Sequence, residues 1–270
     1  MKRPGVSKIA AATVALMVLV PSCGKKRYES NAALLGKAVE SAAPRGEWDK
    51  AEKLVEQAVA QNPNDANART MLALALEQRG DLEKALSEAE AAIEADADNF
   101  MAQYTYGRLL FKSKDYGNCP KPLKKANALK PKDPHTLLLL AKTYAMLDID
   151  ADAITYYAAL AKTKQYAGKP EPYNELGVLF LKKKNYQMAK KLFQKALEQA
   201  PDNPVVNKNM GVFWESIASI FEKTDAKKAR IASAKAVQHY KTCLSALSAS
   251  NPASADKRRA IQAHIDALSK

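Results

Sequence analysis

A 34-residue period runs through most of the 270-residue chain, and it limits the folds that the chain can adopt. A small residue follows a short turn-like stretch at each step, and three of the five are followed twelve positions later by proline. No unit of this length can bury its own apolar face, so several units must stack. The small residues are Ala51, Ala85, Cys119, Ala153 and Ala189, of which the first four are separated by 34 residues each.

The composition favours helices and excludes several other classes. The chain has many alanines and only 10 glycines, and 47% of its residues are hydrophobic. Alanine loses no side-chain entropy in a helix, and this apolar content is enough for a core, which excludes a disordered chain. Three cysteines and three scattered histidines exclude a disulfide framework and most metal clusters.

Motifs that carry chemistry are missing from the sequence. The three histidines lie in no HExxH or CxxC setting, and no glycine-rich phosphate loop, GxSxG or kinase signature occurs. We therefore predict a non-catalytic protein with no catalytic, cofactor-binding or metal-binding residues. Cys119 and Cys243 occupy small-residue positions, which predicts two buried thiols that do not pair.

The repeating residues resemble the tetratricopeptide repeat, and one unit matches it clearly. The resemblance implies an all-α fold: a right-handed α-solenoid of about six repeats with a C-terminal capping helix. We expect the sixth repeat to be irregular, with lengthened helices over 211–222 and 226–247. The matching residues of the clearest unit are Leu176, Gly177, Phe180, Ala189, Phe193, Ala196 and Pro201. The expected repeats are 32–65, 66–99, 100–133, 134–169, 170–203 and 204–252, with the capping helix at 253–270.

The N-terminus has the pattern of an export signal. Basic residues precede the apolar run 9–20, which as a helix spans roughly 18 Å, less than the ~30 Å core of a bilayer. The run ends in Val-Pro-Ser-Cys, which resembles a bacterial lipoprotein lipobox whose cysteine, Cys23, becomes lipidated. We predict a signal peptide over 1–22 and a polar tether over 23–31. Simple secretion and an uncleaved anchor are the alternatives.

The lipobox also predicts a location. By the sorting rule of lipoproteins, Gly24 after the cysteine indicates the outer membrane, facing the periplasm of the bacterial cell envelope. An exported chain does not meet nucleic acid, so we expect protein partners and a membrane contact through the lipid. The sequence leaves the oligomeric state open.

Charge is distributed unevenly along the chain. Residues 33–100 hold 7 basic and 14 acidic side chains, whereas residues 101–200 hold 18 basic and 8 acidic ones. Residues 201–270 carry a further net charge of +5. This asymmetry predicts an acidic end and a basic middle that meet different surfaces.

The first helices of tetratricopeptide repeats line a concave groove, and the resemblance places a set of residues there. Cations beside exposed Tyr and Phe side chains suit an acidic, partly apolar peptide. The alternative is that the lysines only solvate a surface; Lys190 and Lys191, for example, fall on a second helix and so on the convex side. The expected groove residues are Tyr104, Arg108, Phe111, Lys112, Lys142, Asn174, Val178, Lys182, Lys208 and Asn209.

These features together predict an envelope lipoprotein that binds protein partners as a scaffold. The outline resembles the pilotin lipoproteins of type IV pili, which implies a role in assembling a pilus or secretion complex. It also resembles tetratricopeptide adaptors for peptidoglycan hydrolases. A binder of anionic envelope polymers or lipids is the alternative from a different class.

Overall fold

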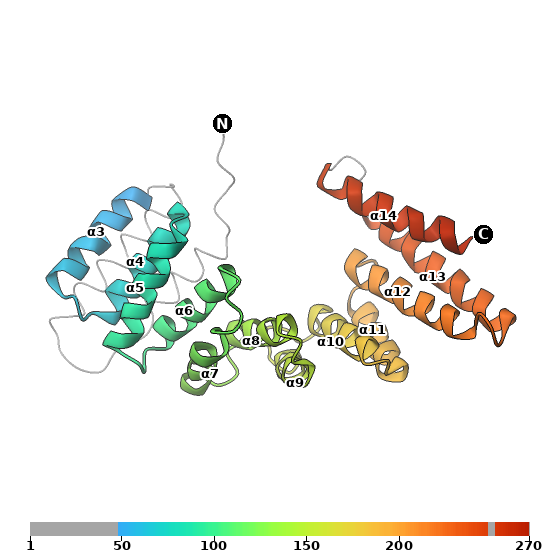
Figure 1. Ribbon diagram of the computed structural model, residues 1–270, viewed down its shortest axis with the longest axis horizontal. Coiled ribbons are helices and arrows are strands. Elements are labelled where there is room, and N and C mark those ends of the chain that lie inside the picture. The colour runs from blue at the N-terminus through green and yellow to red at the C-terminus, as the bar shows by residue number, and fades with distance from the viewer. Residues whose placement is uncertain (1–47, 248–251, 270) are drawn as a thin grey trace. The chain divides into compact units, whose positions relative to one another are not determined.

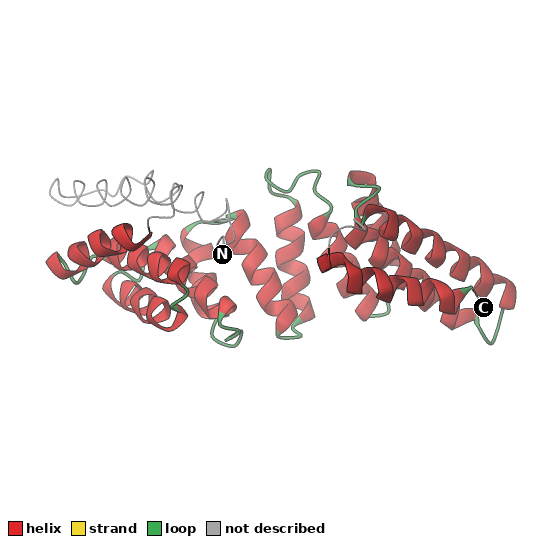
Figure 2. Cartoon of the chain, turned by 90° about the horizontal axis from the view of Figure 1, so that it is seen from above, coloured by secondary structure: helices red, strands yellow, loops and turns green. Residues whose placement is uncertain are grey.

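The computed structural model describes residues 48–247 and 252–269, and every regular element in them is a helix (Figures 1 and 2). The predicted signal peptide, Cys23, the tether and the opening helix of the first repeat lie outside these residues. The predicted all-α fold is confirmed. Within the described part, no helix has both the length and the apolar content to cross a membrane.

Most helices begin at an Asp or Asn whose side chain accepts a hydrogen bond from the first turn. Asp65, for example, accepts from the backbone N–H groups of Asn67 and Ala68 at 3.0 and 3.1 Å. Such a cap satisfies amide groups that have no partner inside the helix. These caps fall in the turns between helices, so the same kind of hydrogen bond starts the next helix at each step. The capping residues are Asp65, Asp81, Asn99, Asp133, Asn185, Asn203 and Asp225.

The chain forms two compact units, one that ends at Asp148 and one that begins at Ile149. We call them the N-terminal unit and the C-terminal unit. The division falls inside the predicted fourth repeat, between its two helices. The described helices of the N-terminal unit are α3 (Trp48–Gln61), α4 (Ala66–Arg79), α5 (Leu82–Ala95), α6 (Phe100–Lys112), α7 (Pro120–Leu129) and α8 (Pro134–Met146).

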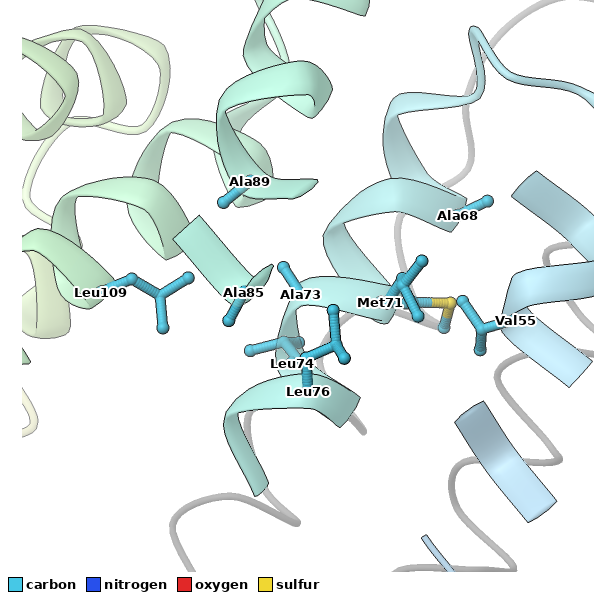
Figure 3. Close-up of a cluster of buried hydrophobic side chains, with 10 residues drawn as sticks. Val55, Ala68, Met71, Ala73, Leu74, Leu76, Ala85, Ala89 and Leu109 are labelled. Carbon is cyan, nitrogen blue, oxygen red and sulfur yellow. The ribbon is translucent and has the colours of Figure 1, made fainter. Parts of the chain in front are cut away.

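The core of the N-terminal unit is built from small and large apolar side chains of four successive helices. Met71 of α4 and Val55 of α3 lie side by side, and Leu109 of α6 points toward Ala85 of α5 (Figure 3). Val55, Ala85 and Leu109 are completely buried. Because each helix contributes to the contact with the next, no single pair of helices makes this core alone.

The C-terminal unit holds the remaining helices. Its helices are α9 (Asp150–Ala161), α10 (Glu171–Lys182), α11 (Tyr186–Gln199), α12 (Pro204–Phe221), α13 (Ala226–Ala246) and α14 (Pro252–Leu268). The helix α14 packs on α13 through Ile261 and Ile265, beside Tyr240. Glu215 of α12 ties these helices together, because its carboxylate accepts from the Tyr240 hydroxyl at 2.7 Å and contacts His264 Nδ1 at 2.9 Å.

The last helix pair is longer than the others, as expected for the sixth repeat, but its first helix begins earlier than predicted. Helices α12 and α13 have 18 and 21 residues, and α12 begins at Pro204 rather than Gly211. The Asn203 side chain accepts from the N–H groups of Val205 and Val206, and Pro204 occupies the first turn, where its missing N–H costs nothing. These two residues fix the start of the helix.

A glycine on the first helix contacts a bulky side chain on the second helix in three pairs. A Cβ on Gly177 of α10 would lie 2.6 Å from Cε1 of Phe193 on α11, and Phe193 is completely buried. Gly107 faces Leu123 and Gly211 faces Tyr240 in the same way. The close approach of the two helices therefore depends on the missing side chain.

We predict that Gly177→Ala lowers the free energy of unfolding by about 1–2 kcal/mol. Overpacking a core costs about 1–3 kcal/mol, and the helix propensity of alanine returns somewhat less than 1 kcal/mol. Urea unfolding followed by circular dichroism measures the change. Gly117→Ala is the control, because a Cβ at Gly117 meets nothing within 4 Å. Equal stabilities of the two variants would contradict the packing argument.

Candidate functional site

The exposed side of α6 and α8 in the N-terminal unit forms the first candidate surface. Helix α6 contacts both α4 and α8, so these first helices lie next to one another. The 34-residue period makes Arg108 equivalent to Lys142 and Lys112 equivalent to Met146, so both pairs belong to one side of the unit. We call Tyr104, Arg108, Lys112, Lys142 and Met146 the first-helix face. Lys142 is exposed, and Met146 is 55% exposed.

Two cations of the first-helix face are held by a buried carboxylate on the neighbouring helix. The Glu77 side chain of α4 is 4% exposed and accepts from Arg108 Nη1 at 2.7 Å and from Lys112 Nζ at 3.0 Å. Burial alone raises the pKa of Glu77, but the hydrogen bonds and charges of Arg108 and Lys112 outweigh it, so the pKa lies below its ordinary value. Arg108 is therefore positioned by Glu77, whereas Lys142 makes no ion pair with any of the described residues.

The aromatic side chains expected in the groove are half-buried rather than open. Tyr104 stacks on Phe100 with ring centroids 6.1 Å apart, and Phe111 makes an edge contact with Tyr116 at 5.2 Å. Such pairs fix the rings in the surface of the unit. The apolar side chain that protrudes most on this face is Met146, which the sequence analysis did not single out. Its equivalence to Lys112 in the repeat was the signal that could have found it.

The predicted groove residues of the C-terminal unit are mostly engaged within it. Asn174 is 2% exposed, and its side-chain oxygen accepts from Asn209 Nδ2 at 2.9 Å. Lys182 pairs with Asp150 at 2.9 Å. Asn174 thus joins α10 to α12, and of the predicted groove residues in this unit Val178, Lys182 and Lys208 remain exposed.

The described nucleophiles and bases are placed for packing. Cys119 and Cys243 are free and buried, as predicted, and burial raises the pKa of Cys119 to about 11. The thiolate, which is the reactive form, is therefore rare at neutral pH. Burial lowers the pKa of His239, whose Nδ1 contacts Asn207 Oδ1 at 2.9 Å. Within 48–247 and 252–269, no group of three His, Cys, Asp or Glu side chains could hold a metal ion.

A hollow of about 380 Å³ lies between α3, α4 and α5. Most of its charged groups are already paired: Glu52 with Arg79 at 2.7 Å, Glu88 with Arg69 at 2.7 Å and Lys84 with Asp81 at 3.4 Å. Leu72 and Leu76 form its apolar wall. A hollow in which most charges already have partners gains little from a charged ligand, so the first-helix face is the better candidate.

Two segments of the chain match the tetratricopeptide-repeat family, residues 37–100 and residues 170–203. The chain therefore carries tetratricopeptide repeats, a fold that serves as a scaffold for protein–protein interaction and not, in general, for catalysis. No curated protein matches the chain in sequence.

Solved structures of repeat proteins superpose on most of the chain. PilF of Pseudomonas aeruginosa is 19% identical, with a TM-score of 0.62 over 88% of this chain and 99% of PilF. YrrB, a tetratricopeptide protein with an unusual peptide-binding site, is 20% identical, with a TM-score of 0.57 over 71% of this chain and 96% of YrrB. MamA from Desulfovibrio magneticus RS-1 is 21% identical, with a TM-score of 0.56 over 63% of this chain and 94% of MamA. At these identities the likeness establishes the fold.

We predict that Glu77→Gln lowers the free energy of unfolding at pH 7 by about 1–3 kcal/mol, because Arg108 and Lys112 lose their charged acceptor. The ordinary pKa of this carboxyl is 4.5, and its pKa in the folded protein is lower. The stabilisation by the ionised carboxylate is therefore complete above pH 4.5, and it is lost as the pH falls through the pKa that Glu77 has in the folded protein. Urea unfolding of both proteins at several pH values measures it. If the difference in free energy of unfolding between the wild type and Glu77→Gln grew as the pH fell, the ion pairs of Glu77 would not be its cause.

Proposed function

We propose that the protein is a lipid-anchored scaffold of the bacterial cell envelope that binds a protein partner through the first-helix face. The observation that carries the proposal is the pairing of an exposed cation, Lys142, with the exposed Met146 one turn further along α8. Beside them Arg108 and Lys112 share the single carboxylate of Glu77, so this part of the face keeps a net positive charge. An acidic segment with an apolar side chain complements this face.

The proposed cellular role is the assembly of a pilus or secretion complex in the outer membrane. The fold that PilF shares with this chain supports the role, since it extends over nearly the whole of PilF. The lipobox at Cys23 and the export signal before it support the location. A role as an adaptor for peptidoglycan hydrolases is the alternative, and it uses the same kind of surface with a different partner.

We predict that Lys142→Glu combined with Met146→Ser abolishes partner binding without unfolding the protein, because both side chains are exposed. Mature protein is used to capture partners from detergent-solubilised envelopes, which are identified by mass spectrometry. The control combines Lys121→Glu with Met188→Ser, since Lys121 and Met188 are also exposed but lie on the second helices α7 and α11.

We call the Lys142→Glu, Met146→Ser protein the face variant. Recovery of a secretin or pilus component by the wild type and the control, but not by the face variant, supports the proposal. Recovery of a murein hydrolase with the same pattern moves the role to the cell wall. Partners that the face variant retains in full would refute binding through this face.

We predict separately that Cys23→Ala abolishes incorporation of a labelled fatty acid, and that the precursor stays unprocessed or the protein loses its stable membrane anchor. Several acyl chains together give stable attachment, whereas a single chain or surface charge alone gives a reversible one. Metabolic labelling and fractionation measure both effects. Unchanged labelling would show that Cys23 is not the modified residue.

A further inference from the structure

The outer sides of α11 and α13 in the C-terminal unit carry cations with hardly any acidic side chains. Helix α13 has five basic residues and no acidic one over its 21 residues, a length of about 32 Å at 1.5 Å per residue. Helix α11 has three lysines and one glutamate. Lys228 pairs with Asp225 at 3.1 Å; among the described residues, no other of these eight cations makes an ion pair. The cations are Lys190, Lys191, Lys195, Lys227, Lys228, Arg230, Lys235 and Lys241.

One indole joins the two helices into a single surface. The ammonium groups of Lys190 on α11 and Lys235 on α13 lie 5.5 and 4.3 Å from the ring centroid of Trp214 on α12. Each contact is favourable, yet both bring like charges toward the same ring with no carboxylate paired to either. A negatively charged surface would supply the counter-charge that both ammonium groups lack among the described residues. We call the outer sides of α11 and α13, centred on Trp214, the basic second-helix surface.

An apolar side chain stands in the middle of these charges. Ile231 is 48% exposed and lies one turn from Lys227 and one turn from Lys235. A cationic helix with an apolar residue on its outer side suits the boundary between headgroups and acyl chains, where charge meets phosphate and the apolar group leaves water.

We propose that the basic second-helix surface binds the anionic face of a lipid bilayer. Seven of its eight cations are lysines, which act as point charges and lack the planar fork that grips one carboxylate or phosphate. Diffuse attraction to a charged plane fits this composition better than recognition of a particular peptide. Nucleic acid fits less well, because stacking of bases needs an open ring and two lysines cover Trp214. The inference concerns a different surface from the first-helix face and stands apart from the function proposed above.

The test is flotation of the chain from Gly24 onward with vesicles, so that neither the apolar run nor a lipid on Cys23 contributes. The vesicles are phosphatidylcholine alone or an equimolar mixture of phosphatidylcholine and phosphatidylglycerol. We expect binding to the mixture only. Replacing Lys190, Lys227 and Lys235 by Gln should weaken it on the order of a hundredfold, since each basic residue contributes about fivefold near an anionic surface.

The matched control replaces Lys162, Lys164 and Lys183 by Gln, which removes the same charge from exposed positions outside α11 and α13. We expect it to bind within about threefold of the wild type, because these three lysines lie outside the basic second-helix surface. Equal losses in the two triple variants would overturn the proposal, since net charge alone would then explain binding.

Two further measurements keep the proposal testable if the triple variant is less stable. Ile231→Ser leaves the charge unchanged and should weaken binding to the mixed vesicles several-fold. In a Trp48→Phe background, Trp214 is the remaining tryptophan, and its fluorescence should shift to the blue on vesicle binding. Absence of both effects overturns the proposal. The proposal is also overturned if the wild type fails to bind anionic vesicles but binds polyglutamate or duplex DNA, and the variant of Lys190, Lys227 and Lys235 loses that binding.

Discussion

The close approach of paired helices is the constraint on which this structure depends. In three pairs a glycine on the first helix leaves room for a completely buried side chain of the second: Leu123, Phe193 and Tyr240. Helices that pack this closely exclude water from the space between them, and their remaining apolar sides must be covered by the next pair. Both functional surfaces result from this arrangement, because stacking first helices together leaves the second helices with a separate outer side.

The sequence was sufficient to predict the fold class, because each helix contact requires a small residue and these residues recur along the sequence. Glycine or alanine must return wherever two helices touch, so Gly177 and Ala189 recur with the period and are both buried. Even Cys119, which replaces an alanine, is completely buried, as its position predicted. The start of α12 was placed too late, because Asn203 and Pro204 set it through local capping that the repeat spacing does not encode.

The surfaces were harder to predict, because the period gives the side of a helix and says nothing of which charges are already paired. Glu77 lies 31 residues before Arg108 and neutralises it, and no local pattern connects the two. The hydrogen bond between the buried Asn174 and Asn209 likewise joins residues of two different repeats. The convergence of Lys190 and Lys235 on Trp214 involves three helices, so only the packed unit brings these residues together.

In the proposed function, protein partners meet the first-helix face and not the second helices of the same unit. Site-specific photo-crosslinking in intact cells tests it most directly, with a benzophenone amino acid at Met146 on α8 or at Ala128 on α7, both exposed. The proposed function predicts a discrete protein adduct from position 146 and none from position 128. An adduct from position 128 alone would contradict it, because the partner would then bind the opposite side of the repeats.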